Sequence, residues 1–412
     1  MKKKYIVFII AILLSVGTYF LFFYQDKNLK YVPENADILI LVDVKKATNQ
    51  YVFSFLTHPS KWFEDKEKDP SKISFSDSGL EIPDFVQIFH LTNTKISDWY
   101  CVLEINDEAK FSTFLKSRKF ISAGKDTFKN NQYFIKIERE KCIVGTSALH
   151  FKNIGKPFFQ IFRNKKLNAE SFMTEGLASI SFISELRTQN FSIDLKNDDE
   201  IEIKNEQNKT DFSSLISDLL TKTQFLEAEL NEENIKKITT VFNKNLNDSV
   251  SVNHLRIRAE LAQVNDTIIS YGYDDNFNEI EKISYQKIVQ PNYHILMQTS
   301  DPDKTWNYFQ SKKWINDQNQ FTVIPFQPNL INKIENQISI KSTQRPIKLN
   351  DNRKQNFIFI KNNALLYSSF KTLSDSDKKF FNTIEYIFYG NKNLDHSVKI
   401  KFKKDKYPLI LR

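Results

Sequence analysis

The chain has 412 residues, enough for two or three domains of about 150 residues each, and its 36 phenylalanines and 41% hydrophobic content argue against general disorder. The net charge of +8 arises from acids and bases that interleave, as in Phe63–Asp69, and the basic runs are short. We therefore expect no nucleic-acid partner.

The first element in chain order is an uncharged apolar segment, Tyr5–Tyr24, preceded by three lysines at Lys2–Lys4. As a helix, this segment extends about 30 Å, the thickness of the hydrocarbon core of a bilayer. The lysines before it and the polar pair Gln25–Asp26 after it favour a cytoplasmic N-terminus. We predict a signal anchor at residues 1–24, a transmembrane helix whose partner is the lipid bilayer. The chain is then a single-pass inner membrane protein with an extracytoplasmic, periplasmic remainder.

The same segment also fits a signal peptide that is cleaved at the small residues Ser15–Gly17. Cleavage would release a secreted protein that begins with the aromatic run Thr18–Tyr24, whereas an uncleaved anchor keeps that run in lipid. We favour the anchor for this reason. A lipoprotein is excluded because the first cysteine of the chain is Cys101.

Residues 25–31 are expected to form a tether, and Val32–Val44 reads as a turn with a proline followed by a strand. This turn and strand, together with the strand end Ile143–Ser147, resemble uncharacterised membrane-anchored envelope proteins of Bacteroidota. The resemblance covers mainly Val32–Ser147. It implies an extracytoplasmic α+β protein, and it brings no active site with it.

An internal similarity relates Trp99–Ile121 to Tyr293–Ile315, which align without a gap. Each window reads as a strand, a tight turn, a short amphipathic helix and a further strand. The identical residues are Asp107/Asp301, Lys110/Lys304, Ser117/Ser311, Lys119/Lys313 and Ile121/Ile315.

A second pair of segments follows in the same order, and both segments read as hairpins. Phe134–Ile137 with Cys142–Val144 resembles Phe357–Ile360 with Leu365–Tyr367. We therefore predict an α+β fold in which a strand–helix–strand–hairpin unit is duplicated and diverged. The expected boundaries are 32–165 for the first unit, 166–249 for a connecting region, and 250–412 for the second unit.

Two helices are predicted between the copies, because apolar residues recur at helical spacing in Phe212–Leu220 and in Ile235–Phe242. A hairpin is then expected from Val250–Leu261 and Thr267–Tyr273, with its turn at Asn265–Asp266. Strands and helices alternate without a regular βαβ series, which favours the α+β class.

Local motifs for chemistry are absent from the sequence. The eight glycines are scattered, so that no phosphate-binding loop or nucleophile elbow occurs, and the six histidines show no zinc-binding spacing. We predict no cofactor, no metal site and no catalytic residue. Cys101 and Cys142 could form a disulfide in an oxidising compartment, but two cysteines do not make a disulfide scaffold in a chain of this size. Both lie in apolar strand patterns, and we favour unpaired core residues.

The repeated aspartates Asp107 and Asp301 have two interpretations. They could form a carboxylate pair for acid–base catalysis, but each also stands immediately before a predicted helix. A carboxylate at that position accepts hydrogen bonds from free backbone N–H groups, and Pro302 suits the first helical position behind Asp301. We interpret both as helix caps.

Aromatic residues are the remaining indication of a binding site. Four tryptophans, 16 tyrosines and 36 phenylalanines exceed what a minimal core needs, and some are expected to line a groove for glycan, peptide or lipid. The tryptophans are Trp62, Trp99, Trp306 and Trp314.

We predict a membrane-anchored, non-catalytic binding or scaffolding protein of the cell envelope, with other envelope proteins or glycans as partners. The alternative is an extracytoplasmic enzyme, hydrolase-like, whose site forms only in the fold. The sequence leaves the oligomeric state open.

Overall fold

The computed structural model describes residues 24–62, 73–131, 133–154, 167–173, 175–184, 187–205, 209–242, 250–324, 329–342, 347–349, 353, 355–363, 365–366 and 375–411. The chain divides into two compact units. Unit 1 is Met1–Glu206 with Asp405–Arg412, and unit 2 is Gln207–Lys404.

Unit 1 is built on an antiparallel sheet with the strand order β12-β11-β10-β2-β3-β4-β8-β7-β6-β5. Leu39 and Leu41 of its central strand β2 are fully buried, as the alternation of a half-buried strand requires. The elements of unit 1 are β1 (Asn28–Leu29), β2 (Ala36–Asp43), α2 (Val44–Thr57), η1 (Pro59–Lys61), β3 (Phe85–Leu91), β4 (Trp99–Glu104), α3 (Glu108–Ser117), β5 (Ile121–Gly124), β6 (Thr127–Asn130), β7 (Tyr133–Glu138), β8 (Lys141–Gly145), β9 (Leu167–Asn168), η2 (Ala169–Ser171), β10 (Ala178–Ile183), β11 (Thr188–Lys196), β12 (Glu200–Asn205) and η3 (Leu409–Leu411).

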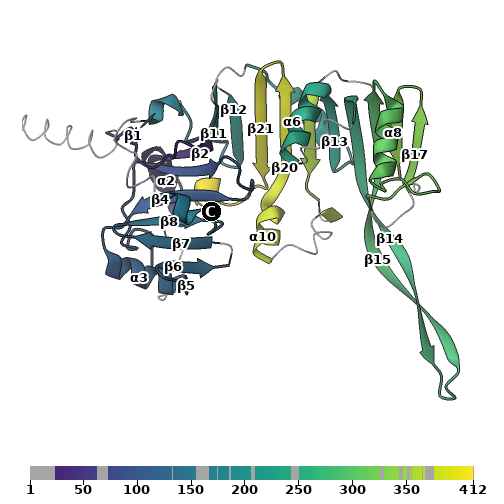
Figure 1. The fold of residues 1–412 in the computed structure, drawn as a ribbon, viewed down its shortest axis with the longest axis horizontal. Coiled ribbons are helices and arrows are strands. Elements are labelled where there is room, and N and C mark those ends of the chain that lie inside the picture. The colour runs from purple at the N-terminus through teal and green to yellow at the C-terminus, as the bar shows by residue number, and fades with distance from the viewer. Residues whose placement is uncertain are drawn as a thin grey trace, which may run out of the picture. The chain divides into compact units, whose positions relative to one another are not determined.

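Unit 2 is built on a second antiparallel sheet, in the order β21-β20-β19-β13-β14-β15-β18-β17-β16. Helices α6 and α8 lie on the same side of this sheet (Figure 1). The elements are α5 (Ser213–Leu220), β13 (Leu226–Asn231), α6 (Glu232–Phe242), β14 (Val252–Tyr273), β15 (Glu279–Thr299), α8 (Pro302–Ser311), β16 (Gln320–Phe321), β17 (Asn329–Ile334), β18 (Gln337–Lys341), β19 (Asn356–Lys361), α10 (Asp375–Thr383), β20 (Ile384–Lys392) and β21 (Asp395–Phe402).

The two units repeat one topology. In unit 1 the series β2, α2, β3, β4 and α3 is followed by the hairpin β7–β8 and then by β10, β11 and β12. In unit 2 the series β13, α6, β14, β15 and α8 is followed by β17–β18 and then by β19, β20 and β21. The strand pairings correspond one by one, for example β4 with β8 and β15 with β18.

The predicted α+β class is wrong. Within the described residues, strands make up 47% and helices 21%, and the pairings in both sheets are antiparallel. The sequence underestimated the strand content because polar stretches such as Thr188–Asn205, for which no strand was predicted, form a strand hairpin, β11–β12. An antiparallel sheet needs only one buried face, so such strands carry many polar residues.

The predicted transmembrane helix is also corrected. No helix in the described part of the chain is long and apolar enough to cross a membrane. Residues 1–23, which make up nearly all of the predicted anchor, lie outside the described residues.

Other expected elements differ in position. The tether at 25–31 contains β1, which pairs with β9, and its Leu29 and Tyr31 are buried. The connecting region 166–249 is shared between the units, because β9 to β12 belong to unit 1 and α5, β13 and α6 to unit 2.

Two hairpin predictions are wrong. Residues 252–273 form one continuous strand, β14, so that no turn exists at Asn265–Asp266, and the chain reverses instead at Asp274–Asn278. The segment Phe357–Ile360 is β19, which corresponds to β10, whereas the counterpart of the β7–β8 hairpin is β17–β18.

The predicted helices at Phe212–Leu220 and Ile235–Phe242 are confirmed as α5 and α6. Leu215, Ile216 and Leu219 of α5 are buried against Phe357 and Phe359 of β19.

Candidate functional site

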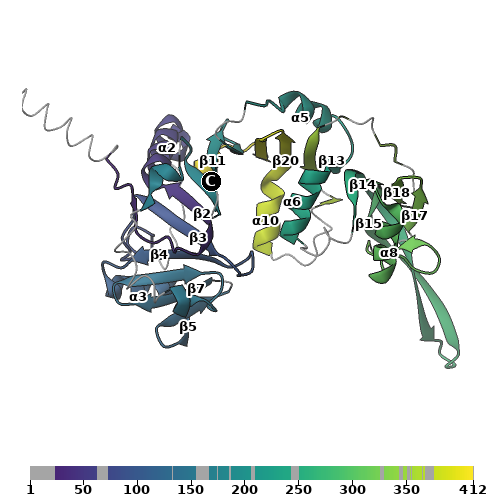
Figure 2. The ribbon, with the colours of Figure 1, turned by 45° about the horizontal axis from the view of Figure 1, so that its top comes forward.

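The most prominent feature of unit 2 is the hairpin of β14 and β15, which projects far beyond the sheet (Figures 1 and 2). The two strands pair continuously up to Tyr273 and Glu279. On one side, β13 accompanies β14 only as far as Ala259, and on the other side β18 meets β15 only from His294 onwards. Residues Leu261–Pro291 therefore form a two-stranded ribbon whose edges are not covered by another described strand.

The ribbon lengthens a hairpin that, in the repeated fold, needs only two short strands and a short turn. The equivalent hairpin of unit 1 consists of β3 with 7 residues and β4 with 6, whereas β14 has 22 residues and β15 has 21. Because unit 1 builds the same sheet without such an extension, the ribbon is not a requirement of the topology.

The tip of the ribbon is a turn held by one carboxylate. Asp274 accepts hydrogen bonds from the backbone N–H groups of Asn276 and Asn278, at 2.9 and 2.8 Å. These bonds, chiefly those from Asn278, hold the pKa of Asp274 below its usual value. Phe277 adopts a left-handed backbone conformation (φ 61°) within this turn, and its side chain is 84% exposed. A bulky side chain in this conformation is unusual, and such residues concentrate at functional sites.

One face of the ribbon is aromatic and acidic. Residues that face each other in an antiparallel pair lie on the same side of the sheet. Tyr271 pairs with Glu281, Tyr273 pairs with Glu279, and Ile269 pairs with Ile283, so these three pairs succeed one another on a single face. The rings of Tyr271 and Tyr273 are 67% and 69% exposed. We call these six residues the aromatic face.

The opposite face of the ribbon carries polar groups together with the aliphatic side chains of Ile268 and Ile280, and none of the exposed rings. Ser270 pairs with Lys282, and the amide of Gln286 donates a 3.1 Å hydrogen bond to Asp266. The stem of Lys282 lies across Gly272, with its Cε 3.2 Å from where a Cβ would stand. The ribbon therefore exposes its apolar rings on one face only.

The ribbon also differs in charge from the rest of the chain. Leu261–Pro291 contains five carboxylates and two lysines, a net charge of −3, in a chain whose net charge is +8. The remainder of the chain thus carries +11.

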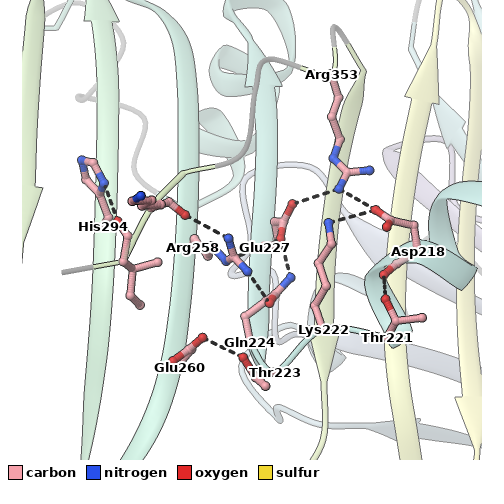
Figure 3. Close-up of polar contacts among 12 residues, drawn as sticks. Asp218, Thr221, Lys222, Thr223, Gln224, Glu227, Arg258, Glu260, His294 and Arg353 are labelled. Atoms are coloured by element: carbon pink, nitrogen blue, oxygen red, sulfur yellow. Dashed lines mark hydrogen bonds and ion pairs between the residues drawn. The ribbon is translucent and has the colours of Figure 1, made fainter. Parts of the chain in front are cut away.

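A second polar feature, shown in Figure 3, lies on the sheet of unit 2. It is on the face opposite α8, because Arg258 is adjacent in β14 to Ala259, which packs with Phe309 of α8 in the core. Glu227 of β13 is buried, and Arg258 stands opposite it on β14. Gln224 bridges them, because its amide N–H donates to Glu227 and its oxygen accepts from Arg258 at 3.0 Å. Arg353 reaches the same carboxylate at 3.6 Å and Asp218 at 2.6 Å.

These charges hold a segment of chain against the sheet. Arg258 donates to the backbone oxygen of Lys348 at 2.9 Å, and Nδ1 of His294 lies 3.2 Å from that of Ile347. Burial lowers the pKa of His294. The backbone N–H of Arg353 donates to the buried Glu229 at 3.1 Å.

This cluster leaves little room for a ligand. The cavity among its described residues has a volume of about 10 Å³, at the lower limit for a single water molecule. Hydrogen bonds from Lys222 and Arg353 keep the pKa of Asp218 below its usual value, so its charge is matched within the fold. We interpret the cluster as structural.

Two larger pockets have polar lining groups that are already hydrogen-bonded within the fold. A pocket of about 190 Å³ in unit 1 includes Tyr31, whose hydroxyl donates to Glu104. Burial, followed by this bond, raises the pKa of Tyr31. A pocket of about 350 Å³ in unit 2 includes Thr210, which donates to Asp395 at 2.8 Å, and Asn356, which accepts from the backbone of Asn231 at 2.7 Å.

The residues singled out in the sequence have structural roles. Asp107 and Asp301 are helix caps, as predicted, accepting from the N–H groups of Lys110 and Lys304 at 2.9 and 2.8 Å. They belong to different units. Cys101 and Cys142 are free, as predicted, and burial raises the pKa of each thiol to about 12.

The histidines and tryptophans do not gather at one place. His254 of β14 lies 3.5 Å from Glu229, and His294 of β15 lies 3.0 Å from the Ser339 hydroxyl, so both have partners within the sheet. Trp306 and Trp314 pack against the core of unit 2, and Trp62 is half exposed.

Sequence reasoning missed the ribbon. The available signal was the Asx-rich stretch Asp274–Asn278, which is preceded by Ile269, Tyr271 and Tyr273 and followed by Glu279, Glu281 and Ile283, in each case at every second residue. Asparagine and aspartate stabilise turns by accepting bonds from the backbone two residues on, which is what Asp274 does.

Comparison of the chain with protein-family models, with curated proteins and with solved structures finds no match. The resemblance to envelope proteins of Bacteroidota therefore stays a prediction, and the function is argued from the ribbon.

Proposed function

We propose that this chain is a non-catalytic binding protein, and that the ribbon Leu261–Pro291 is the element that engages its partner. The observation that carries the proposal is the aromatic face, on which Tyr271 and Tyr273 are two-thirds exposed on a structure that the repeated topology does not require. Exposed apolar surface gathered on one side of an element is typical of interaction sites. Tyrosine is enriched where proteins bind one another, because its ring is large and loses little conformational entropy.

The turn supports the same conclusion. Phe277 is presented at the extreme end of the ribbon by a hydrogen-bonded loop, and its left-handed backbone costs free energy in the isolated chain. A rigid turn that presents a ring to solvent lowers the entropy that binding must overcome.

Site-directed photo-crosslinking in the source cells tests the proposal. A benzophenone amino acid is placed at Tyr271, on the aromatic face, and in a matched variant at Ser270, on the polar face. We expect a discrete adduct from position 271 and little or none from position 270, although the two residues are neighbours in one strand. Equal adducts from both positions, or none from either, would refute the ribbon as the binding element.

The location of the described units outside the cytoplasm, predicted from residues 1–24, belongs to this proposal as well. An Asp275→Cys variant places a thiol at the exposed turn, and the two native thiols are shielded by burial. We expect a membrane-impermeant maleimide to label this variant in intact spheroplasts. Labelling only after lysis would place the chain in the cytoplasm.

A further inference from the structure

The aromatic face combines rings with carboxylates in an order that suggests what it binds. Glu281 stands beside Tyr271, and Glu279 stands beside Tyr273, in directly opposed pairs. Side chains so paired have Cβ atoms about 5 Å apart. Each tyrosine ring therefore has a negative charge immediately next to it.

This arrangement fits a cationic side chain. A guanidinium or ammonium group is attracted to the face of an aromatic ring, and a neighbouring carboxylate completes its charge pairing. The protein uses the first of these contacts within unit 2, where Lys312 lies over the ring of Tyr308 and Lys333 over that of Trp306. Within the described part of the chain, no lysine or arginine lies over Tyr271 or Tyr273.

The charge of the ribbon indicates which kind of partner can bind this face. The net charge of −3 on Leu261–Pro291 disfavours an anionic bilayer and nucleic acid, because both would be repelled. It also disfavours side-by-side association of two ribbons, which would bring like charges together. A positively charged partner is attracted instead.

We propose that the aromatic face binds a basic segment of a partner protein, with arginine or lysine side chains seated on Tyr271 and Tyr273 and paired with Glu281 and Glu279. This inference rests on the proposed function, since it names the chemistry of the partner that the ribbon engages. The face places its two tyrosine rings two residues apart on β14 and its two carboxylates two residues apart on β15. An extended partner segment with a basic residue at every second position matches that spacing.

The test uses the full chain and a fluorescein-labelled 15-residue peptide with arginine at every second position and serine between. The matched control peptide carries citrulline in place of arginine, which keeps the shape and removes the charge. Binding is followed by fluorescence anisotropy at low and at physiological salt. We expect binding of the arginine peptide that weakens as salt rises, and at least about tenfold weaker binding of the citrulline peptide.

Two double variants and one single control variant test whether the peptide binds at the aromatic face. Glu279→Gln with Glu281→Gln removes the charges, and Tyr271→Ser with Tyr273→Ser removes the rings. Asp266→Asn removes one carboxylate from the polar face of the same ribbon and serves as the control. We expect each double variant to weaken binding by about tenfold, with Asp266→Asn within about twofold of the wild-type chain. Four of the five substituted side chains are exposed, and that of Asp266 is half-buried. A melting temperature equal to that of the wild-type chain verifies that each variant folds.

Absence of arginine-peptide binding, or equal binding by the double variants and the wild-type chain, would overturn the inference. Binding to zwitterionic phosphatidylcholine vesicles in place of the peptide, abolished by Phe277→Ser, would overturn it in favour of a lipid surface. In each case an adduct from position 271 but not from position 270 would still uphold the ribbon as the binding element. Failure of the inference is thus distinguishable from failure of the proposed function.

Discussion

Asp107 and Asp301 hold the same place in two separate units, each capping the helix that follows a central strand. Their carboxylates accept from the backbone N–H three residues on, at 2.9 and 2.8 Å. The helices they begin also end alike, because Lys119 and Lys313 both take a left-handed conformation, with φ of 60° and 58°. The sequence identities between the two windows therefore mark the positions that start and stop one kind of helix.

Removing the cap of α8 should destabilise unit 2. We expect Asp301→Ala to lower the free energy of unfolding by about 1 kcal/mol, because the N–H of Lys304 loses its acceptor. Asp301→Asn, which retains an acceptor, should cost a few tenths of that amount. Urea unfolding followed by the fluorescence of Trp306 and Trp314 measures both. Equal losses for the two variants would contradict the cap.

The cap of α3 should respond to pH. The backbone N–H of Lys110 lowers the pKa of Asp107 in the folded chain. A carboxyl group with a lowered folded pKa stabilises above its unfolded pKa, about 3.9, and that contribution disappears as pH falls through the folded value. We expect the difference in stability between the wild-type chain and Asp107→Ala to be largest near pH 7 and to vanish near pH 2. A difference that grows on acidification would contradict the assignment.

The buried carboxylate of Glu227 should contribute more to stability than the half-buried one of Glu260. Glu227→Ala leaves Arg258 and Arg353 without the group that pairs them, and we expect unit 2 to lose about 2–3 kcal/mol of stability. Glu260→Ala is the control, since Glu260 bonds the exposed Thr223, and its effect should stay within about 0.5 kcal/mol. Chemical denaturation measures the loss of stability in both variants. Similar losses would show that the cluster in Figure 3 does not stabilise unit 2.

The turn of the ribbon should gain order when its strained residue is replaced. Asparagine adopts the left-handed conformation of Phe277 more readily than a bulky side chain. We therefore expect Phe277→Asn to slow amide hydrogen exchange at Asn276 and Asn278, measured by NMR, while the crosslink from position 271 weakens. Faster exchange would show that the phenylalanine ring itself stabilises the turn.

Local signals in the sequence identified particular elements well. The Asp301-Pro302 pair specified a helix start, and the apolar stripe of Phe212–Leu220 specified α5, because both depend on neighbours within one turn. The apolar strand patterns around the cysteines also indicated the burial of Cys142, whereas Cys101 is half-buried.

Long-range features could not be predicted in the same way. Asn265–Asp266 has the composition of a turn, yet Lys287 and Gln286 pair with these residues in a continuous strand. Which of two Asx-rich stretches reverses the chain depends on the register of the whole hairpin, and register is set by the sheet at its base. Likewise, the cluster around Glu227 joins α5, β13, β14 and a residue more than a hundred positions away, Arg353. No spacing of residues in the sequence predicts that these side chains lie together.

The ribbon also sets a length scale. Thirteen residues of β14, Leu261–Tyr273, rise at about 3.3 Å each, so Phe277 stands about 40 Å from the last fully paired row of the sheet. A target recessed in a crevice, or shielded by bulky neighbours, is thereby accessible to the tip while the globular body of unit 2 stays clear of it. A force on a bound target would be transmitted to unit 2 through this two-stranded ribbon. Shortening β14 and β15 by two residues at a time would shorten the ribbon and leave the tyrosines on the same face.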